Sequence, residues 1–188
     1  MTLTELFQKH GSDKHDESSP GAGHCYGPLY ERLLEGKRER ITSVLEIGVL
    51  KGASLRAWRD WFPNAWVHGM DKDSECLFWG DRIECSLADQ EDPSSLIEMA
   101  EAGRCTTFDL VVDDGSHRAQ DQLTTLATLF HRLRPGGDWF IEDVGHVPLQ
   151  DVVTAVGVLI GNRAEVTVHD LRHVRDRHDD LIIQVRVP

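Results

Sequence analysis

The sequence lacks long apolar runs, paired cysteines and an excess of positive charge, and each absence narrows the class of protein. No apolar run approaches the roughly 20 residues of a membrane-spanning helix, and the first ten residues do not resemble a signal peptide. The four cysteines show no CxxC spacing, so neither a zinc site nor a disulfide framework is indicated. The net charge of −12 argues against nucleic-acid binding, which depends on Lys and Arg. We therefore expect a cytoplasmic protein that binds neither membranes nor nucleic acid.

The order of strand-like and helix-like runs predicts an α/β fold in one domain, residues 1–188. Helical patterns separate the first five strand-like runs, and this alternation predicts a doubly wound, mostly parallel sheet of seven strands. The last two runs look like paired strands, with the last strand antiparallel. The seven runs are Ser43 to Val49, Trp66 to Met70, Ile83 to Leu87, Phe108 to Val112, Asp138 to Ile141, Ala164 to Leu171 and Leu181 to Val187.

The first 40 residues form an N-terminal helical segment that we expect to act as a lid within this domain. Leu3 to His10 and Tyr30 to Glu39 have the spacing of amphipathic helices. Between them, Gly11 to Gly27 is too polar and too broken for regular structure. Loops of this length are often functional, so we expect His24 and Tyr26 to fold over a ligand.

Two acidic clusters follow the fourth and fifth predicted strands. The first is Asp113-Asp114-Gly115-Ser116-His117, and the second is Ile141-Glu142-Asp143, whose strand follows a predicted turn at Arg134-Pro135-Gly136-Gly137. Because the carboxyl ends of parallel strands meet in one crevice, these carboxylates would repel one another unless protons or a divalent cation neutralise them. Oxygen ligands favour a hard cation such as Mg²⁺, Mn²⁺ or Ca²⁺. The pattern predicts metal-assisted chemistry, with His117 close enough to act on a metal-held substrate.

A glycine turn after the first strand, from Glu46 through Gly48 and Gly52 to Ser54, predicts a nucleoside site. Its E-x-G-x-x-x-G spacing lacks the middle glycine of a dinucleotide motif. Asp71, after the second strand, is placed to accept two hydrogen bonds from ribose hydroxyls, and Asp89, after the third, could reach an exocyclic amine of adenine. A nucleoside without phosphates fits this acidic surround better than NAD does. The alternative is a glycine turn that only packs a strand against a helix.

These motifs resemble those of the class I S-adenosylmethionine-dependent methyltransferases, and more narrowly the macrolide-sugar O-methyltransferases that act on mycinamicin- and macrocin-type deoxysugars. The resemblance covers roughly residues 6 to 145, and the D-D-G-S-H and I-E-D runs are its most specific part. The other matching motifs are Gly11-Ser12-Asp13-Lys14, His24-x-Tyr26, Tyr30-Glu31-Arg32, Ser54-Leu55-Arg56-Ala57-Trp58, Phe62-Pro63 and Arg134-Pro135-Gly136-Gly137.

The resemblance implies a methyl transfer from S-adenosylmethionine to a small-molecule hydroxyl acceptor, above all a sugar on a glycosylated natural product such as an antibiotic. It implies a Mg²⁺ or Mn²⁺ ion held by Asp114, Glu142 and Asp143, with His117 as the general base. We expect the cofactor to contact Glu46, Gly48, Gly52, Ser54, Asp71, Asp89, Asp113, Lys14 and Tyr26. For Asp113, holding the following helix or the cofactor-binding loop is an equally good alternative.

The sequence departs from this group at two places. The larger relatives carry an additional N-terminal domain, which we do not expect here. They also carry an aromatic-rich substrate insert after the E-D pair, where this chain continues as Val144-Gly145-His146-Val147-Pro148. We therefore expect an acceptor pocket that is shallow, or is completed by the N-terminal segment or by another subunit of a homo-oligomer.

Other alcohols or phenols are alternative acceptors, and two other functions stay open. The cephalosporin-hydroxylase-like proteins share much of this pattern and carry out different chemistry. The second of these functions is a non-catalytic subunit that only binds S-adenosylmethionine, and the intact His117 argues against it. His146 is a second candidate base, although a surface histidine is the simpler interpretation.

Overall fold

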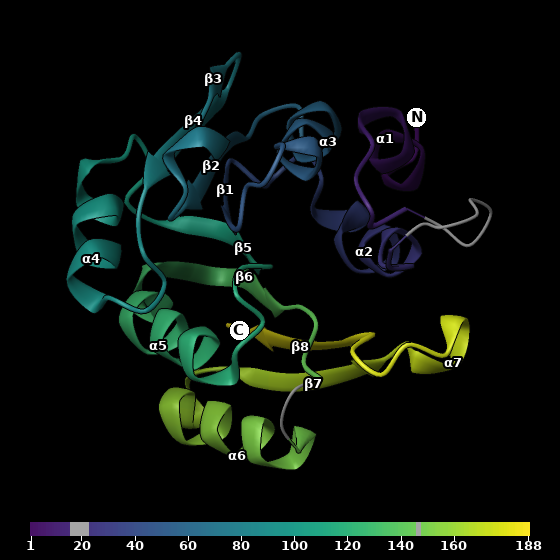
Figure 1. Ribbon diagram of the computed structural model, residues 1–188, viewed down its shortest axis with the longest axis vertical. Helices are drawn as coiled ribbons and strands as arrows, with labels where there is room; N and C mark the ends of the chain where they lie inside the picture. The colour runs from purple at the N-terminus through teal and green to yellow at the C-terminus, as the bar shows by residue number, and fades with distance from the viewer. Residues whose placement is uncertain (16–22, 146–147) are drawn as a thin grey trace.

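A computed structural model describes residues 1–15, 23–145 and 148–188, so that His146 and part of the predicted lid lie outside the described residues. Within these ranges one sheet has the strand order β3-β4-β2-β1-β5-β6-β8-β7 (Figure 1). The strands are β1 (Ser43–Ile47), β2 (Trp66–Asp71), β3 (Trp79–Gly80), β4 (Ile83–Leu87), β5 (Phe108–Asp113), β6 (Leu133–Ile141), β7 (Glu165–Asp170) and β8 (Leu181–Arg186).

The predicted α/β fold with a mostly parallel sheet is confirmed. Strand β1 pairs in parallel with β2 and β5, β2 with β4, and β5 with β6. Strand β8 runs antiparallel to both β6 and β7, as expected for the last strand. The sheet also contains β3, an antiparallel strand of two residues that is too short to produce a hydropathy pattern. The described sheet therefore has eight strands where the sequence predicts seven.

Helices cover both faces of the sheet, as Figure 1 shows. Helices α1, α2 and α3 lie on one face, and α4, α5 and α6 lie on the other. Their bounds are α1 (Leu3–His10), α2 (Gly27–Leu34), α3 (Ala53–Trp61), α4 (Pro93–Ala102), α5 (Ala119–Leu129) and α6 (Leu149–Ile160), and a short helix α7 (Arg172–Arg175) precedes β8. Single 3₁₀ turns occupy Glu35–Lys37, Ser74–Cys76, Phe130–Arg132 and Gly161–Arg163.

Local capping explains where several helices begin. Helix α1 starts with a capping box, because the Thr2 hydroxyl accepts from the Glu5 amide and the Glu5 carboxylate accepts from the Thr2 amide. Helix α4 starts with the Asp92 carboxylate accepting from the Ser94 amide and with Pro93 in the first turn.

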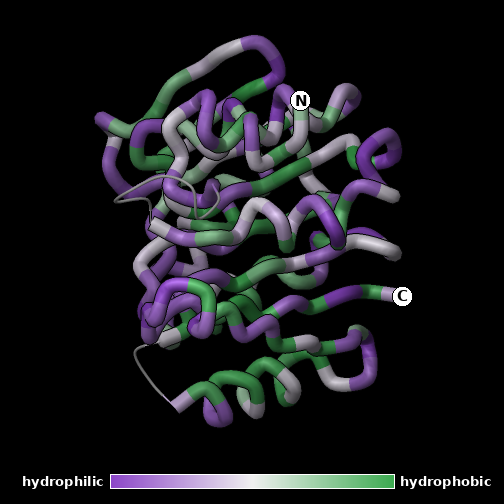
Figure 2. Tube along the Cα trace, turned by 90° about the vertical axis from the view of Figure 1, so that its right-hand side faces the viewer, coloured by the Kyte–Doolittle hydropathy of each residue, from purple (hydrophilic) through white to green (hydrophobic). Residues whose placement is uncertain are grey.

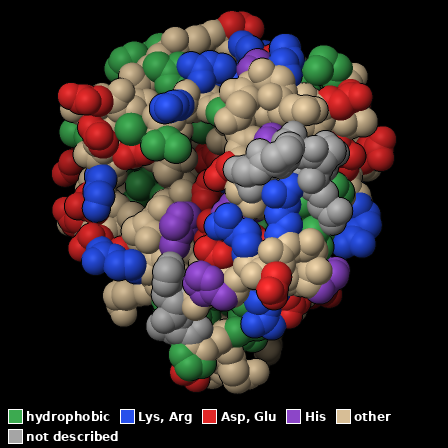
Figure 3. All heavy atoms as spheres, turned by 45° about the vertical axis from the view of Figure 1, so that its right-hand side comes forward, with side chains coloured by type: hydrophobic (Ala, Val, Ile, Leu, Met, Phe, Trp, Pro, Cys, Tyr) green, Lys and Arg blue, Asp and Glu red, His purple; other side chains and the backbone are tan. Residues whose placement is uncertain are grey.

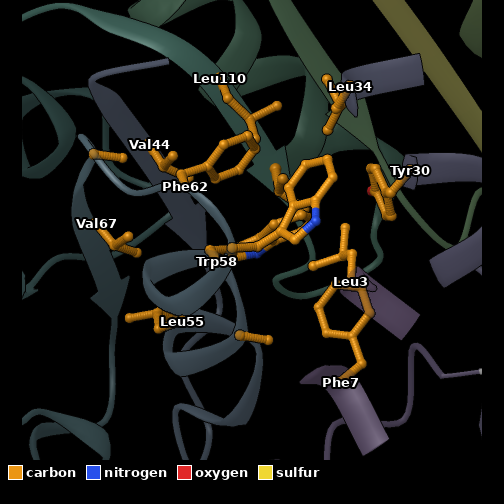
Figure 4. Packing of buried hydrophobic residues seen from close by; sticks show 14 of the residues in the cluster. Leu3, Phe7, Tyr30, Leu34, Val44, Leu55, Trp58, Phe62, Val67 and Leu110 are labelled. Atoms are coloured by element: carbon orange, nitrogen blue, oxygen red, sulfur yellow. The ribbon is translucent and has the colours of Figure 1, made fainter. Parts of the chain in front are cut away.

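Alternating side chains of the strands fill two hydrophobic clusters, one on each face of the sheet. Figure 2 shows the apolar residues concentrated in the strands and in α6. Trp58 of α3 is central to the first cluster, where the rings of Phe7 and Tyr30 meet it edge-on at 4.9 and 5.2 Å (Figure 4). Trp139 of β6 is fully buried in the second cluster. The N-terminal segment is thus anchored to the core through α1 and α2.

The prediction of a turn at Arg134-Pro135-Gly136-Gly137 is wrong, because these residues lie within β6. Gly136 has a φ of 77°, and the pairing of β5 with β6 shifts register between Phe108 and Leu110. The turn-forming residues therefore produce an irregularity inside a longer strand.

All four cysteines are free thiols, in agreement with the absence of a disulfide framework. Over the described ranges, every helix is too short or too polar to span a lipid bilayer.

Candidate active site

Two adjoining pockets open at the carboxyl ends of the parallel strands. Pocket A, about 420 Å³, is lined by Gly48, Asp71 and Asp89, with Gln90 and Ser116 across from them. Pocket B, about 770 Å³, shares Gly48 and Asp71 with pocket A and is lined further by Asp114, His117 and Asp143. Figure 3 shows acidic, basic and histidine side chains gathered around a hollow on one face of the molecule. The two pockets therefore share part of their lining.

The glycine turn after β1 is held by Asp71. One oxygen of its carboxylate accepts from the backbone amides of Val49 and Leu50, at 2.8 and 3.2 Å. Gly48 has a φ of 90°, and a Cβ atom there would overlap the carbonyl oxygen of Asp114. Only glycine therefore allows the β1 turn to lie against the β5 turn.

Gln90 links the end of β4 to the end of β5. Its amide nitrogen donates to Asp113 at 2.6 Å, and its amide oxygen accepts from the Ser116 backbone at 3.0 Å. Asp113 is fully buried, and burial raises its pKa to about 7. It lines neither pocket, and Gln90 joins it to the loop that follows β5.

Asp114, His117 and Asp143 come together in pocket B. Their potential ligand atoms all lie within 4.8 Å of one another, which suits a single metal ion. His117 Nδ1 lies 3.7 Å from Asp143 Oδ2, and about a third of the His117 side chain is exposed. Both residues have left-handed backbone conformations, with φ angles of 57° and 56°. These strained turns orient the two side chains toward one point.

Glu142 is held away from solvent by the N-terminal segment. The Tyr30 hydroxyl donates to one carboxylate oxygen, and the Lys14 ammonium donates to the other at 2.5 Å. Lys14 also donates to Asp114, so one ammonium contacts two of the three carboxylates predicted to bind metal. Burial alone would lower the pKa of Lys14, but Asp114 and Glu142 raise it well above its ordinary value.

Asp143 is also contacted from the N-terminal segment. The Tyr26 hydroxyl donates to it, and His24 Nδ1 lies 3.4 Å from it and 2.5 Å from Asp180. His24, Asp179 and Asp180 form a second group with ligand spacing, but the Arg177 guanidinium lies 3.4 and 3.6 Å from the two carboxylates and supplies their countercharge.

Burial raises the pKa of several carboxyl groups at the site. Burial raises the pKa of Glu46 to about 7, against the attraction of Lys14. Burial and neighbouring carboxylates also raise the pKa of Glu142 and of Asp143. Such a cluster needs positive charge to hold its carboxylates ionised.

These shifts predict that the protein in EDTA becomes less stable as the pH rises. An acid whose folded pKa is raised stabilises the fold below its unfolded pKa, and this contribution is lost as the pH rises through the folded pKa. The melting temperature in EDTA should therefore fall between about pH 5 and about pH 8.

Glu46→Gln removes one of these groups, whose pKa is about 7 against an ordinary 4.5. Such a shift corresponds to about 3 kcal/mol. The variant should melt with the wild type near pH 5 and above it near pH 8. A wild-type melting temperature that stays constant or rises over this range would contradict the prediction.

The structure brings most of the predicted site residues to the two pockets. The predicted residues that line them are Gly48, Ser54, Asp71, Asp89, Asp114, His117 and Asp143. Six others do not line either pocket, namely Glu46, Gly52, Asp113, Lys14, Tyr26 and Glu142. Lys14 and Tyr26, for which we expect a cofactor contact, donate hydrogen bonds to Glu142 and Asp143. Gly52 (φ 67°) precedes α3, where a Cβ atom would overlap the ring of Phe78.

Sequence reasoning assigned no role to Tyr30 or Gln90. The Y-E-R motif marked Tyr30 as part of the family signature, and Gln90 directly follows Asp89. No pattern connects either residue to its carboxylate partner, which lies 112 and 23 residues away.

Comparison with known proteins identifies relatives that methylate sugars. The chain is 37% identical over 149 residues to 8-demethyl-8-alpha-L-rhamnosyl tetracenomycin-C 2'-O-methyltransferase of Streptomyces olivaceus, which covers 76% of this chain. It is 35% identical over the same share of the chain to mycinamicin VI 2''-O-methyltransferase of Micromonospora griseorubida. No protein-family model matches.

A solved structure agrees with these relatives. The MycE methyltransferase from the mycinamycin biosynthetic pathway, in complex with Mg and SAH, superposes with a TM-score of 0.77 at 28% identity, over 100% of this chain and 55% of its own. The chain spans 37% of the tetracenomycin relative and 36% of the mycinamicin relative. The resemblance predicted from the motifs is confirmed: the homologues of this chain are sugar O-methyltransferases.

Proposed function

We propose that this chain carries out a metal-dependent transfer of a methyl group from S-adenosylmethionine to a hydroxyl of a sugar on a glycosylated natural product. The observation that carries the proposal is the shared wall of the two pockets, because Gly48 and Asp71 line both. A nucleoside in pocket A would therefore meet an acceptor in pocket B. In this proposal residues 1–188 are one methyltransferase domain, and residues 1–40 form a wall of its site.

The donor set of pocket B supports a hard divalent ion such as Mg²⁺ or Mn²⁺. Asp114 and Asp143 offer carboxylate oxygens beside His117. Glu142 is a third carboxylate at this site, because the Lys14 ammonium contacts it as well as Asp114. Oxygen ligands without a thiolate favour Mg²⁺ or Mn²⁺ over zinc. Asp114, Asp143 and Glu142 would hold the ion, with the ligand atoms of the first two already close together.

The residues of pocket B account for the remaining chemistry. A bound divalent ion would polarise the acceptor hydroxyl, which is otherwise a poor nucleophile near neutral pH. His117 lines the pocket and takes the hydroxyl proton as the oxygen attacks the methyl group. The glycine turn lies against the backbone of Asp114, so a cofactor bound at this turn would share one crevice with the acceptor. S-adenosylmethionine would supply the methyl group and would leave as the neutral thioether S-adenosylhomocysteine.

The lining of pocket B supports a hydroxyl-rich acceptor. Ser12, Asp13, Lys51, Asp73 and Arg177 offer hydrogen-bond donors and acceptors, and the pocket is larger than pocket A. Sugars are recognised through such groups, and the relatives named above methylate sugar-bearing molecules.

Asp71→Ala tests the cofactor site. If Asp71 accepts hydrogen bonds from ribose, its loss should weaken S-adenosylhomocysteine binding by about 1.5–3 kcal/mol, or roughly 10–100-fold in Kd by calorimetry. Asp73→Ala is the matched control, because Asp73 carries the same charge nearby but lines only pocket B. Equal affinity of Asp71→Ala and the wild type would remove this assignment.

The proposed reaction is tested by product mass. The protein is incubated with S-adenosylmethionine, Mg²⁺ and rhamnosylated or deoxysugar-bearing acceptors, and the acceptor should gain one CH₂ group. A gain of one oxygen would indicate hydroxylation instead. Binding of S-adenosylhomocysteine without turnover of any glycoside or phenol would favour a non-catalytic role.

A further inference from the structure

Lys14 is a fully enclosed positive charge inside the acidic cluster. Its side chain is 2% exposed, and its ammonium contacts both Asp114 and Glu142, the latter at 2.5 Å. His24 lies 3.4 Å from the carboxylate of Asp143, and the Arg177 guanidinium lies beside Asp179 and Asp180. Among the described residues, the Lys14 ammonium is the cation that contacts Asp114 and Glu142 directly.

The position of Lys14 is fixed from several sides. The backbone amide of Lys14 lies 3.3 Å from the Ser12 hydroxyl, and its carbonyl accepts from the Gly27 amide at 2.7 Å, which ties it to the start of α2. On the other side, Tyr30 holds the second oxygen of Glu142. The ammonium and the carboxylate therefore face each other from rigid supports.

Charge balance gives this arrangement a purpose. Asp114, Glu142 and Asp143 together carry three negative charges when ionised, and a divalent ion supplies only two positive ones. One enclosed ammonium completes the neutralisation that a buried cluster requires. The same ammonium repels the divalent ion and contacts two of the carboxylates that would bind that ion.

We propose that Lys14 is a resident cation of the metal site, which stays beside the divalent ion and limits how tightly that ion binds. This inference rests on the proposed metal-dependent function. It assigns Lys14 to the tuning of metal affinity, whereas the sequence motif alone suggested a contact with the cofactor. Lys14 lines neither pocket, which agrees with a role that does not involve the cofactor.

The test compares Lys14→Met with Lys14→Arg by calorimetric titration of MgCl₂ into protein saturated with S-adenosylhomocysteine. Methionine keeps the length of the side chain and removes the charge, while Tyr30 still holds Glu142. Lys14→Met should bind Mg²⁺ at least about tenfold more tightly than the wild type, because a repulsion between close charges is removed. Lys14→Arg keeps the charge and should stay within a few-fold of the wild type.

A second signature separates this role from a purely structural one. In EDTA, Lys14→Met should melt below the wild type, and Mg²⁺ should raise its melting temperature by more than it raises that of the wild type. S-adenosylhomocysteine affinity should be equal in all three proteins. Mg²⁺ binding to Lys14→Met that is equal to or weaker than in the wild type would overturn the inference.

A measurement on the wild type covers the case in which Lys14→Met does not fold. The lysine ζ-nitrogen signals are recorded by NMR while Mn²⁺ is added, and Lys14→Arg identifies the Lys14 signal by its disappearance. Mn²⁺ should broaden that signal strongly, since the ammonium stays beside the ion. A sharp Lys14 signal at saturating Mn²⁺ would overturn the inference, whereas a wild type that binds neither ion would overturn the proposed function itself.

Discussion

Chelation with EDTA should abolish methyl transfer, and Mg²⁺ or Mn²⁺ should restore it. The physical reason is that a neutral sugar hydroxyl is a poor nucleophile. Its polarisation by a divalent ion lowers the activation free energy by several kcal/mol. Zinc should not restore activity specifically, because Asp114, Glu142 and Asp143 offer oxygen ligands and no thiolate. The measurement is initial rate against metal concentration, with S-adenosylmethionine saturating.

Single substitutions in the cluster should have the same effect. Asp114→Ala, Glu142→Ala and Asp143→Asn should each lower turnover by at least about 10³-fold. Asparagine is chosen at position 143 because it tolerates the left-handed backbone there. Asp81→Ala removes an exposed carboxylate outside both pockets and should change nothing. Full activity of the cluster variants in chelator would assign the cluster a structural role only.

Replacing His117 by alanine should lower kcat by about 10²–10⁴-fold, with S-adenosylhomocysteine and metal still bound. His117 lines pocket B beside Asp114 and Asp143 and is partly open to the solvent that an acceptor would displace. Because only neutral imidazole accepts a proton, the wild-type rate should rise from acidic to neutral pH.

His117→Asn separates a base from an anchor. Asparagine fits the φ of 57° and keeps a hydrogen-bonding side chain, but it has no basic nitrogen. A general base predicts a loss similar to that of alanine, while an anchor predicts near wild-type turnover. His131→Ala removes an exposed histidine away from both pockets and serves as the control. A near wild-type rate for His117→Asn across neutral pH would move the base to another residue.

Local patterns were sufficient to predict the sheet and the edge at which its two pockets open. Each of the seven long strands carries apolar residues in a run or in alternation. The acidic residues at or just after the ends of β2, β4, β5 and β6 lie at one edge because these strands are parallel. The two-residue strand β3 and the helix α7 of four residues are too short to show periodicity.

The partners of the acidic residues were beyond the reach of such patterns. Lys14 meets Glu142 across 128 residues, and Tyr30 meets it across 112. These contacts depend on how the N-terminal segment packs against the sheet, which the periodicity of neither segment encodes. The motif of Lys14 therefore predicts a cofactor contact, while its ammonium lies between Asp114 and Glu142, two carboxylates predicted to bind metal.

Because the backbone is left-handed at His117 and Asp143, selection for stability and selection for activity should favour different residues there. Such a conformation costs a residue with a Cβ atom about 1–2 kcal/mol, which glycine avoids and asparagine reduces. A library screened only for heat resistance should therefore enrich Gly or Asn at these two positions and yield robust but inactive proteins. A library screened for turnover should keep His and Asp there and recover its stability elsewhere in the chain. Different residues selected by the two screens at positions 117 and 143 would show that these positions lower stability in favour of activity.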